Sequence, residues 1–246
     1  METKQSFFRF FKWIGGLIIL FAVGAWTAIF VLQHRAQESA SSLLRETELV
    51  RVGETTSEDL TRTVRHLTAY DAKLYPASIC PGAEVVYGAL AGNSKANEIT
   101  RRFPFLGAIG LQPWSAGAMF WVTQNKVCGF QYEFDTVRST DRKEMAIGVQ
   151  ASRSTPSASA PYIPRISAGS RYLDFTVLLY PEATPEERAR AFDLDFSCAT
   201  TFGGCKNACQ VIRAAWPDFV VKANERDPSL TPVDIDDPIC SGKAAR

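Results

Sequence analysis

The chain has 246 residues and carries 27 Lys and Arg against 26 Asp and Glu, which gives a formal net charge of +1. Nucleic-acid-binding proteins usually present a basic stripe, and a chain with this balance is expected to bind no nucleic acid. The apolar share of 46% is ordinary for a folded globular domain and argues against disorder as the default.

Residues 13–33 form a run without a formally charged side chain. At ~1.5 Å per residue, such a run makes a helix of ~30 Å, the thickness of a bilayer's hydrocarbon core. Three Lys or Arg side chains lie in residues 1–12, whereas only Arg35 follows directly after the run, and such residues favour the cytoplasmic side. We therefore expect a cytoplasmic stub at 1–12, a transmembrane helix at 13–33 in the lipid bilayer, and an exported remainder.

A cleaved signal peptide is the alternative interpretation of this N-terminus. Signal peptides have an apolar region of ~7–15 residues followed by a small-x-small cleavage site. Here the run is longer, and the small residues nearest its end, Ala25 and Ala28, lie inside it. These features favour an uncleaved anchor.

The six cysteines all lie downstream of the apolar run. An even number of cysteines in an exported domain indicates a disulfide framework, because an oxidising compartment lets the bridges persist. A four-cysteine metal site is the alternative, but its closely spaced pair lacks a matching second pair. We expect no metal and no cofactor. The pairing that we predict is Cys80–Cys128, Cys198–Cys205 and Cys209–Cys240.

Alternating apolar and polar residues predict several strands in the exported part. Strands are expected near residues 84–90, 119–123, 127–134, 145–151 and 171–180. A capping box of Thr55 and Glu58 predicts a helix of about three turns, and Thr184 followed by Pro185 predicts another. Residues 205–216 are also expected to be helical. The predicted fold class is α+β: an N-terminal transmembrane helix followed by an antiparallel sheet packed with helices.

The predicted domain organisation follows from where breakers and polar residues gather. We expect a helical stalk at residues 36–50, the exported α+β domain at 51–223 and a polar tail at 224–246. Residues 151–170 are rich in Ser, Ala and Pro, which is typical of a mobile loop or a linker between two lobes. We favour a mobile loop within one domain.

Aromatic side chains are concentrated between residues 103 and 134. Core packing is the simpler interpretation, while a ligand groove lined by aromatic residues is the functional one. The groove candidates are Phe103, Phe105, Trp114, Phe120 and Trp121.

No local motif indicates a catalytic mechanism. The chain has no Gly-x-Ser-x-Gly elbow and no His-Glu-x-x-His pair, and His66 falls off the apolar stripe of its predicted helix. Two carboxylates brought together by the fold would leave no local signature. For that alternative, an exported hydrolase, the first residues to test are Asp193, Asp195 and Glu133.

Residues 52–60 read Val-Gly-Glu-Thr-Thr-Ser-Glu-Asp-Leu. This run resembles the G-x-T-x-x-[DE]-[LV] entry of small envelope domains of the BamE/SmpA type, over about twenty residues. The resemblance implies a sheet-and-helix module that acts by binding in envelope protein assembly. The chain departs from that family in having no lipobox cysteine and no Gly-Pro turn after the helix, and no catalytic residue carries over.

The sequence therefore predicts a single-pass envelope protein, with the bacterial inner membrane and the periplasm as its location. We expect its disulfide-stapled exported domain to be a non-catalytic binding or accessory module. Its expected partners are the bilayer and another envelope protein.

Overall fold

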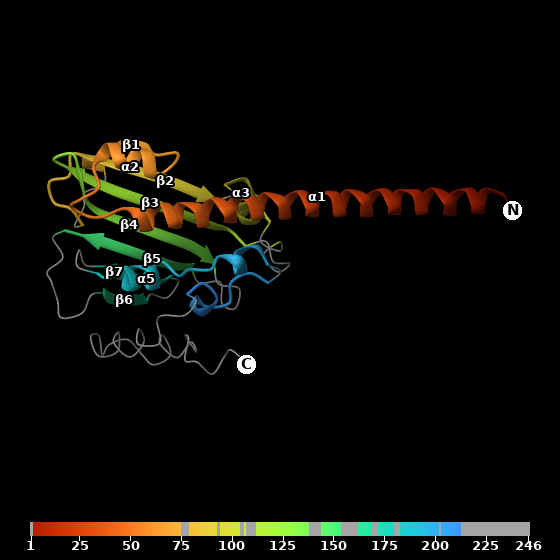
Figure 1. Cartoon of the computed structure of the whole chain (residues 1–246). Helices are drawn as coiled ribbons and strands as arrows, with labels where there is room; N and C mark the ends of the chain where they lie inside the picture. The colour runs from red at the N-terminus through yellow and green to blue at the C-terminus, as the bar shows by residue number, and fades with distance from the viewer. Residues whose placement is uncertain are drawn as a thin grey trace.

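The computed structural model describes residues 2–74, 79–92, 94–103, 106, 112–137, 144–153, 162–168, 172–179, 183–201 and 203–212. One helix, α1 (Glu2–Leu49), runs along one face of a seven-stranded sheet and projects far beyond it (Figure 1). The fold is α+β with a long apolar N-terminal helix, as predicted.

Helix α1 changes its surroundings partway along its length. Residues 13–32 are largely exposed and apolar, and this part is long and apolar enough to cross a membrane. From Gln33 onward one side of the helix is buried, at Ala40, Leu43 and Thr47 among others. These positions recur every three to four residues, which is the spacing of one helix face. Residues 36–50, which we expected as a helical stalk, thus pack onto the sheet.

The sheet has the strand order β1-β2-β3-β4-β5-β7-β6. Neighbouring strands from β1 to β5 are antiparallel, whereas β5 and β7 are parallel. The strands are β1 (Thr68–Asp71), β2 (Val85–Gly92), β3 (Trp114–Thr123), β4 (Lys126–Val137), β5 (Glu144–Ser152), β6 (Tyr162–Ala168) and β7 (Tyr172–Leu179).

The parallel pair corrects the prediction of a purely antiparallel sheet. Strand β6 takes the edge position and pairs antiparallel with β7. Strand β7 lies between β6 and β5 and pairs with β5 in the same direction. The sheet is therefore mixed.

Strand β6 also corrects the prediction for residues 151–170. The interpretation as one mobile loop is wrong for Tyr162–Ala168, which form this edge strand. In the sequence of this strand, Tyr162, Pro164 and Ile166 stand at every second position. The Pro and Ser residues in and around the segment obscure this alternation. An edge strand tolerates Pro164 because one side of its backbone needs no ladder hydrogen bond.

The turn between β3 and β4 is tighter than the three residues left between the strands predicted at 119–123 and 127–134. Gln124 and Asn125 alone join the strands, with φ of 48° and 60°. Two consecutive positive φ values are the signature of a type I′ turn, whose twist matches that of the flanking strands.

Short helices flank the sheet. They are α2 (Ser57–Thr63), α3 (Ser94–Arg102) and α5 (Pro185–Ala191), with single 3₁₀ turns at Ala72–Leu74, Ser197–Thr200 and Ala208–Gln210. The helix start predicted at Thr184 is confirmed, and the side chains of Thr184 and Glu187 form a capping box there. Helix α2 is capped by Thr56 rather than Thr55 and ends at Thr63, because the backbone of Val64 is already extended.

The prediction of a helix at 205–216 is wrong for residues 205–212, the part of it that the structure describes. Residues Ala208–Gln210 form only one 3₁₀ turn, and residues 204–206 before it are not helical. The bridge between Cys198 and Cys205 ties this segment back across seven residues, which favours a compact loop over a continuing helix. Residues 213–246, including the expected polar tail, lie outside the described residues.

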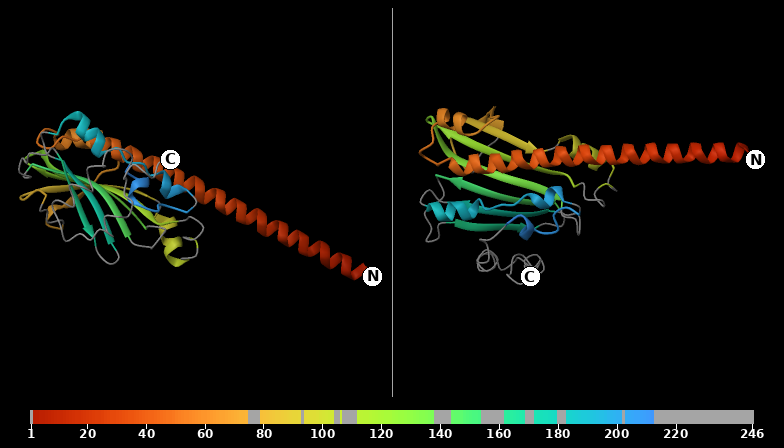
Figure 2. Two further views of the ribbon diagram at one scale, coloured as in Figure 1. Left: turned by 90° about the horizontal axis from the view of Figure 1, so that it is seen from below. Right: turned by 45° about the vertical axis from the view of Figure 1, so that its right-hand side comes forward.

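The core lies between α1 and the sheet face that it covers (Figure 2). Alternate residues of β4 supply its centre, with Phe130, Tyr132 and Phe134 fully buried. Phe196 stacks on Phe134 with ring centroids 4.6 Å apart. The hydroxyl of Tyr132 donates to the carbonyl of Ala40 in α1 at 3.2 Å. Burial raises the pKa of Tyr132, so this hydroxyl keeps its proton.

The C-terminal end of α1 is capped by a side chain from a distant part of the chain. Arg188 in α5 is buried and donates to the carbonyl oxygens of Glu48 at 2.6 Å and Val50 at 2.8 Å. Its guanidinium lies about 6 Å from the ring centres of Phe130 and Phe192. A cation at a helix C-terminus is favourable because the last carbonyls lack partners within the helix.

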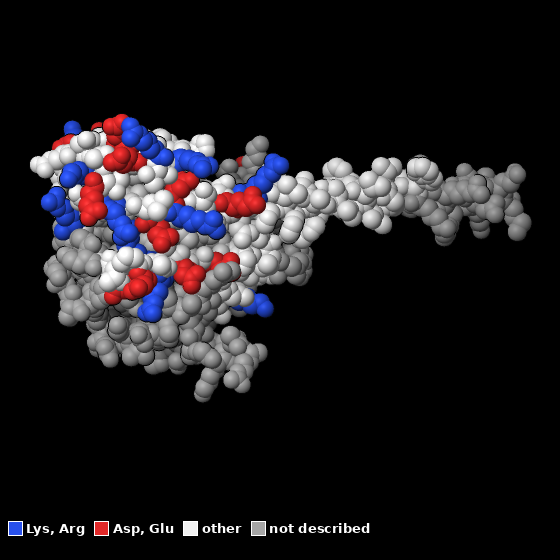
Figure 3. Space-filling model, viewed as in Figure 1, with Lys and Arg blue, Asp and Glu red and all other residues white. Residues whose placement is uncertain are grey.

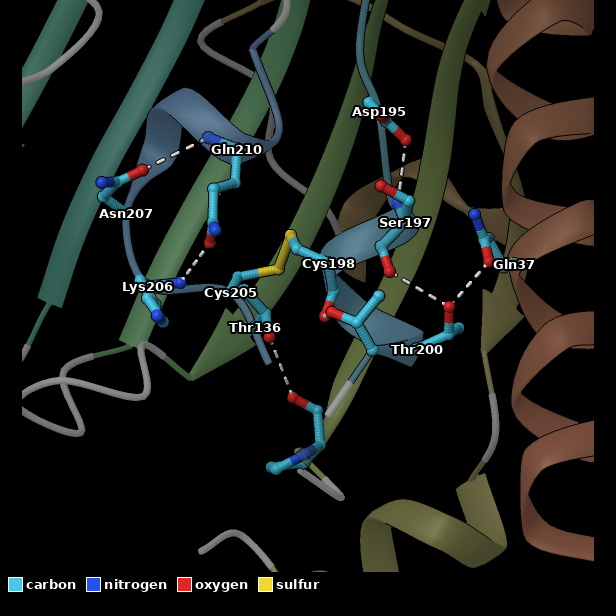
Figure 4. Close-up of a disulfide and its surroundings, with 12 residues drawn as sticks. Gln37, Thr136, Asp195, Ser197, Cys198, Thr200, Cys205, Lys206, Asn207 and Gln210 are labelled. Atoms are coloured by element: carbon cyan, nitrogen blue, oxygen red, sulfur yellow. Dashed lines mark hydrogen bonds between the residues drawn. A yellow bond between two sulfur atoms is a disulfide. The ribbon is translucent and has the colours of Figure 1, made fainter. Parts of the chain in front are cut away.

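Two of the predicted disulfides are present. Cys80 bonds Cys128, and Cys198 bonds Cys205. The second bridge lies close to α1, where Thr200 donates to the side-chain oxygen of Gln37 at 2.9 Å (Figure 4). The predicted Cys209–Cys240 pair involves Cys240, which lies outside the described residues.

Candidate functional site

The sheet face opposite α1 carries an open groove of about 290 Å³. It runs across β1 to β4, on side chains that alternate with those of the core. Its walls include Tyr70, Leu90, Met119, Gln131 and Glu133. Leu90 is 82% exposed, so its apolar side chain is accessible to a ligand in the groove.

Glycines form the floor of this groove. A Cβ added to Gly88 would lie 2.8 Å from the ring of Tyr70, and one added to Gly117 would lie 3.0 Å from the end of Leu90. The side chains of Tyr70 and Leu90 therefore lean over backbone that has no side chain of its own. Glycine at these two positions leaves the room in which the Tyr70 ring and the Leu90 side chain lie against the sheet.

The opposite side of the groove is polar. Gln131 donates to a carboxylate oxygen of Glu133 at 2.7 Å, and Asp135 follows on the same face of β4. The groove thus has one apolar wall and one wall of hydrogen-bonding groups. Such a lining can bind and orient a ligand.

A loop covers another part of this sheet face. Ile79 and Cys80 pack with Val86, Trp121 and Cys128 in a second apolar cluster. The Cys80–Cys128 bridge fixes the loop there, and the hydroxyl of Ser152 donates to the carbonyl of Ile79. Tyr70 and Met119 line the groove and also pack against this cluster, so the bridged loop lies next to the groove.

The five aromatic groove candidates do not share one surface. Trp114 and Phe120 are buried in the core beneath α1, whereas Trp121 lies on the other face under the Cys80 loop. Phe103 is partly exposed beside α3, and Phe105 lies outside the described residues. The structure therefore places the candidate groove on β-strand residues that sequence reasoning missed, such as Leu90 and Gly117. Leu90 carried a weak signal as an apolar residue out of phase with the core positions of its strand.

A second hollow, of about 590 Å³, lies between α1 and the segment after α5. Asp193 and Asp195 both line it, together with Arg45, Glu48 and Arg190. One oxygen of Asp195 accepts from the backbone N–H of Ser197 at 2.9 Å, so this carboxylate also holds the start of a 3₁₀ turn (Figure 4).

The three carboxylates considered for a hydrolase do not converge. Glu133 lies in the groove on one face of the sheet, while Asp193 and Asp195 lie with α1 on the other. His66 lies in the exposed turn after α2 with a positive φ of 57°. Within the described part of the chain, no group of three or more His, Cys, Asp and Glu side chains is placed to hold a metal ion.

The sequence matches no protein-family model, no curated protein and no solved structure.

Proposed function

We propose that this protein is a single-pass membrane-anchored envelope protein whose exported domain is a non-catalytic binding or accessory module. The observation that carries the proposal is α1 itself. One unbroken helix has the length and apolarity of a membrane span at its exposed end and supplies core side chains at its other end.

A continuous helix of this kind would hold the exported domain at a fixed distance from the bilayer. The helix has no proline and no glycine after Gly24, so its packed part continues the projecting part without a hinge residue. The projecting part is free of charged groups over its described side chains, while charges of both signs cover the domain face in Figure 3. A partner bound by the domain would therefore stay close to the membrane.

Three further observations support export to an oxidising compartment such as the bacterial periplasm. The described residues contain two disulfides, and disulfides persist mainly outside the cytosol. The excess of Lys and Arg before the apolar run favours a cytoplasmic N-terminus. The resemblance of residues 52–60 to BamE/SmpA-type domains points to the same compartment.

The partner that fits the groove is an extended segment of another envelope protein. It would lie along the groove beside Tyr70, with apolar side chains against Leu90 and Met119. Gln131 and Glu133 offer hydrogen-bonding groups along the other wall.

Topology and oxidation are tested together by a reporter fused to the C-terminus and a thiol count without reduction. An exported reporter and bonded cysteines are expected. A cytoplasmic reporter, or six free thiols in the purified chain, would overturn the proposal.

Binding is tested by native copurification with a variant that fills the groove. Gly117→Leu is expected to abolish capture of the partner, because the new side chain occupies the floor beside Leu90. Thr61→Leu, on the exposed side of α2, adds a similar apolar surface elsewhere and should leave capture unchanged. Equal capture by both variants would exclude the groove as the binding site.

The alternative function, an exported hydrolase, is favoured only by the pair Asp193 and Asp195 in the second hollow. Asp193→Asn and Asp195→Asn should each abolish hydrolysis of a glycoside or ester panel if this alternative holds. No hydrolysis by the unmodified protein would dismiss it.

A further inference from the structure

Trp114 joins two parts of the molecule at the end of the sheet from which α1 projects. Its indole Nε1 donates to the side-chain oxygen of Gln33 in α1 at 2.6 Å. Its backbone N–H donates to the side-chain oxygen of Asn97 at 3.1 Å, and the amide nitrogen of Asn97 donates back to the Trp114 carbonyl at 2.8 Å. Helix α3, which carries Asn97, is therefore fixed beside the point where α1 leaves the domain (Figure 1).

Gln33 is also the last residue of the apolar run. A run that begins at Trp13 reaches ~30 Å by Gln33, which matches the hydrocarbon core of a bilayer. If α1 spans the membrane, as proposed above, Gln33 lies at the membrane surface. Trp114 and α3 then lie at that surface as well.

Helix α3 has one side that faces the domain and another that is exposed. Asn97 bonds Trp114, and Thr100, one turn later, is buried. Phe103 directly follows the helix, and its backbone N–H still donates to the carbonyl of Ile99 at 2.9 Å. Ile99 and Phe103 therefore lie one turn apart, and they are 41% and 45% exposed. Residues four apart in a helix are neighbours on its surface, so these two form an apolar ridge, which we call the Ile99–Phe103 ridge.

We propose that the Ile99–Phe103 ridge rests in the headgroup region of the bilayer that holds α1, as a second membrane contact of the domain. The proposal depends on the membrane anchoring stated above. Apolar and aromatic side chains are favoured at this depth, where amphipathic helices bury an apolar face. Glu98 directly precedes Ile99 and Arg102 directly precedes Phe103. Over Ser94–Arg102 the sequence carries three basic residues against one acidic residue, a formal charge of +2. Basic residues beside an apolar ridge are typical of interfacial helices, and vesicles of a zwitterionic lipid test the contribution of apolar burial by itself.

A lipid surface fits this ridge better than a protein partner does. The ridge is small, with two large apolar side chains, whereas a specific protein interface buries far more surface. Its position beside the exit of α1 brings it to the bilayer without any change in the fold. Two contacts of this kind would also hold the orientation of the domain about the axis of α1.

The test uses the full chain in phosphatidylcholine vesicles, with a photoreactive p-benzoylphenylalanine placed at one position at a time. Position 103 tests the ridge. Phe21, 81% exposed within the apolar run, reports the span itself. Leu49 is 67% exposed and lies ~24 Å further along α1 than Gln33, so it reports a surface away from the bilayer.

Lipid adducts are expected at positions 21 and 103 and not at position 49. An adduct at 21 without one at 103 overturns this inference and leaves the anchor intact. No adduct at position 21 overturns the anchor, and the inference falls with it. Adducts at all three positions would show unspecific labelling of the domain and would also overturn the inference.

A second variant tests the ridge itself. Ile99→Glu places a charge in the proposed contact and is expected to lower the adduct yield at position 103 several-fold, while the yield at position 21 stays constant. Leu49→Glu is the matched control and should change neither yield. An unchanged yield in the Ile99→Glu chain would overturn the proposal.

Discussion

The indole of Trp114 and the side-chain amide of Gln33 are hydrogen-bonded at 2.6 Å although they lie 81 residues apart. Both side chains are buried, and the nitrogen of the Gln33 amide has no partner among the described residues. This bond holds α1 to β3 at the last residue of the apolar run. The projecting helix and the domain are therefore joined by a polar contact inside an apolar setting, where an unpaired group is costly.

Trp114→Phe is expected to lower the free energy of unfolding by about 1–3 kcal/mol, because the Gln33 oxygen loses its donor while it stays buried. Gln33→Leu in the same chain should restore part of the loss, since neither polar group then remains. Urea unfolding of the two single variants and the double variant, in detergent, measures the coupling. Strictly additive effects would mean that the bond contributes nothing.

Arg188→Met is expected to destabilise the protein by about 2–3 kcal/mol, because the carbonyls of Glu48 and Val50 lose a charged donor. Arg190→Met, two residues further along the exposed side of α5, is the control and should change stability by less than about 0.5 kcal/mol. Chemical unfolding monitored by circular dichroism gives both values. Equal effects at the two positions would rule out the capping role.

The contribution of Arg188 is expected to be independent of pH between about pH 6 and about pH 9. Burial, and then the nearby charge of Arg51, lower the pKa of Arg188 to about 10 from its ordinary 12.5. Below the lower value the group is protonated in both states, so unfolding exchanges no proton there. Above it the folded state releases its proton first, and linkage makes the folded state relatively more stable as the pH rises.

The measurement is the stability difference between the unmodified chain and Arg188→Met across this pH range. A drift in this difference of more than about 0.5 kcal/mol would contradict the assignment, since that would require a titration inside the range.

Removing the Cys80–Cys128 bridge should cost more than removing Cys198–Cys205. The first closes a loop with a sequence separation of 48 and the second one of only 7. On the chain-entropy model the losses are ~4 and ~2.5 kcal/mol. Paired Cys→Ala variants, compared by urea unfolding, test the order. The reverse order would show that packing around the bridges, and not loop length, sets their contribution.

Gly148→Ala is expected to destabilise the sheet by about 1–3 kcal/mol through overpacking. Its Cβ would lie 2.6 Å from the carbonyl oxygen of Tyr132 on the neighbouring strand, so backbone has to move. Gly117→Ala is the matched control, because its closest neighbour is the flexible end of Leu90 at 3.0 Å. Thermal unfolding should separate the two variants clearly. Similar melting temperatures would contradict the close approach of β4 and β5.

Local patterns predicted most of the elements correctly. The alternation through β4 indicated a half-buried strand, and Thr184 with Pro185 marked the start of α5. Both signals depend on neighbours within a few residues, where periodicity and capping operate. The strand β6 was missed because Ser and Pro around it weaken the same kind of signal.

Local sequence patterns could not predict the candidate groove. Leu90 and Gly117 belong to different strands and come together only through the register of β2 and β3. The aromatic residues proposed from sequence were divided between the two faces by that same register: Phe120 points toward α1 and Trp121 away from it. Neighbouring residues in a strand point to opposite faces, so a cluster in sequence is not a cluster in space.

The sequence by itself determined that residues 13–33 form an apolar helix of membrane-spanning length, and its composition indicated a folded, disulfide-bonded domain after it. Only the tertiary structure decided that this helix continues into the core, that Arg188 and Trp114 hold its packed part, and that a groove stays open on the other face of the sheet. The physical reason is the sequence separation over which each interaction acts. Hydropathy and helix propensity act along the chain, whereas strand pairing and buried hydrogen bonds join residues that only folding brings together.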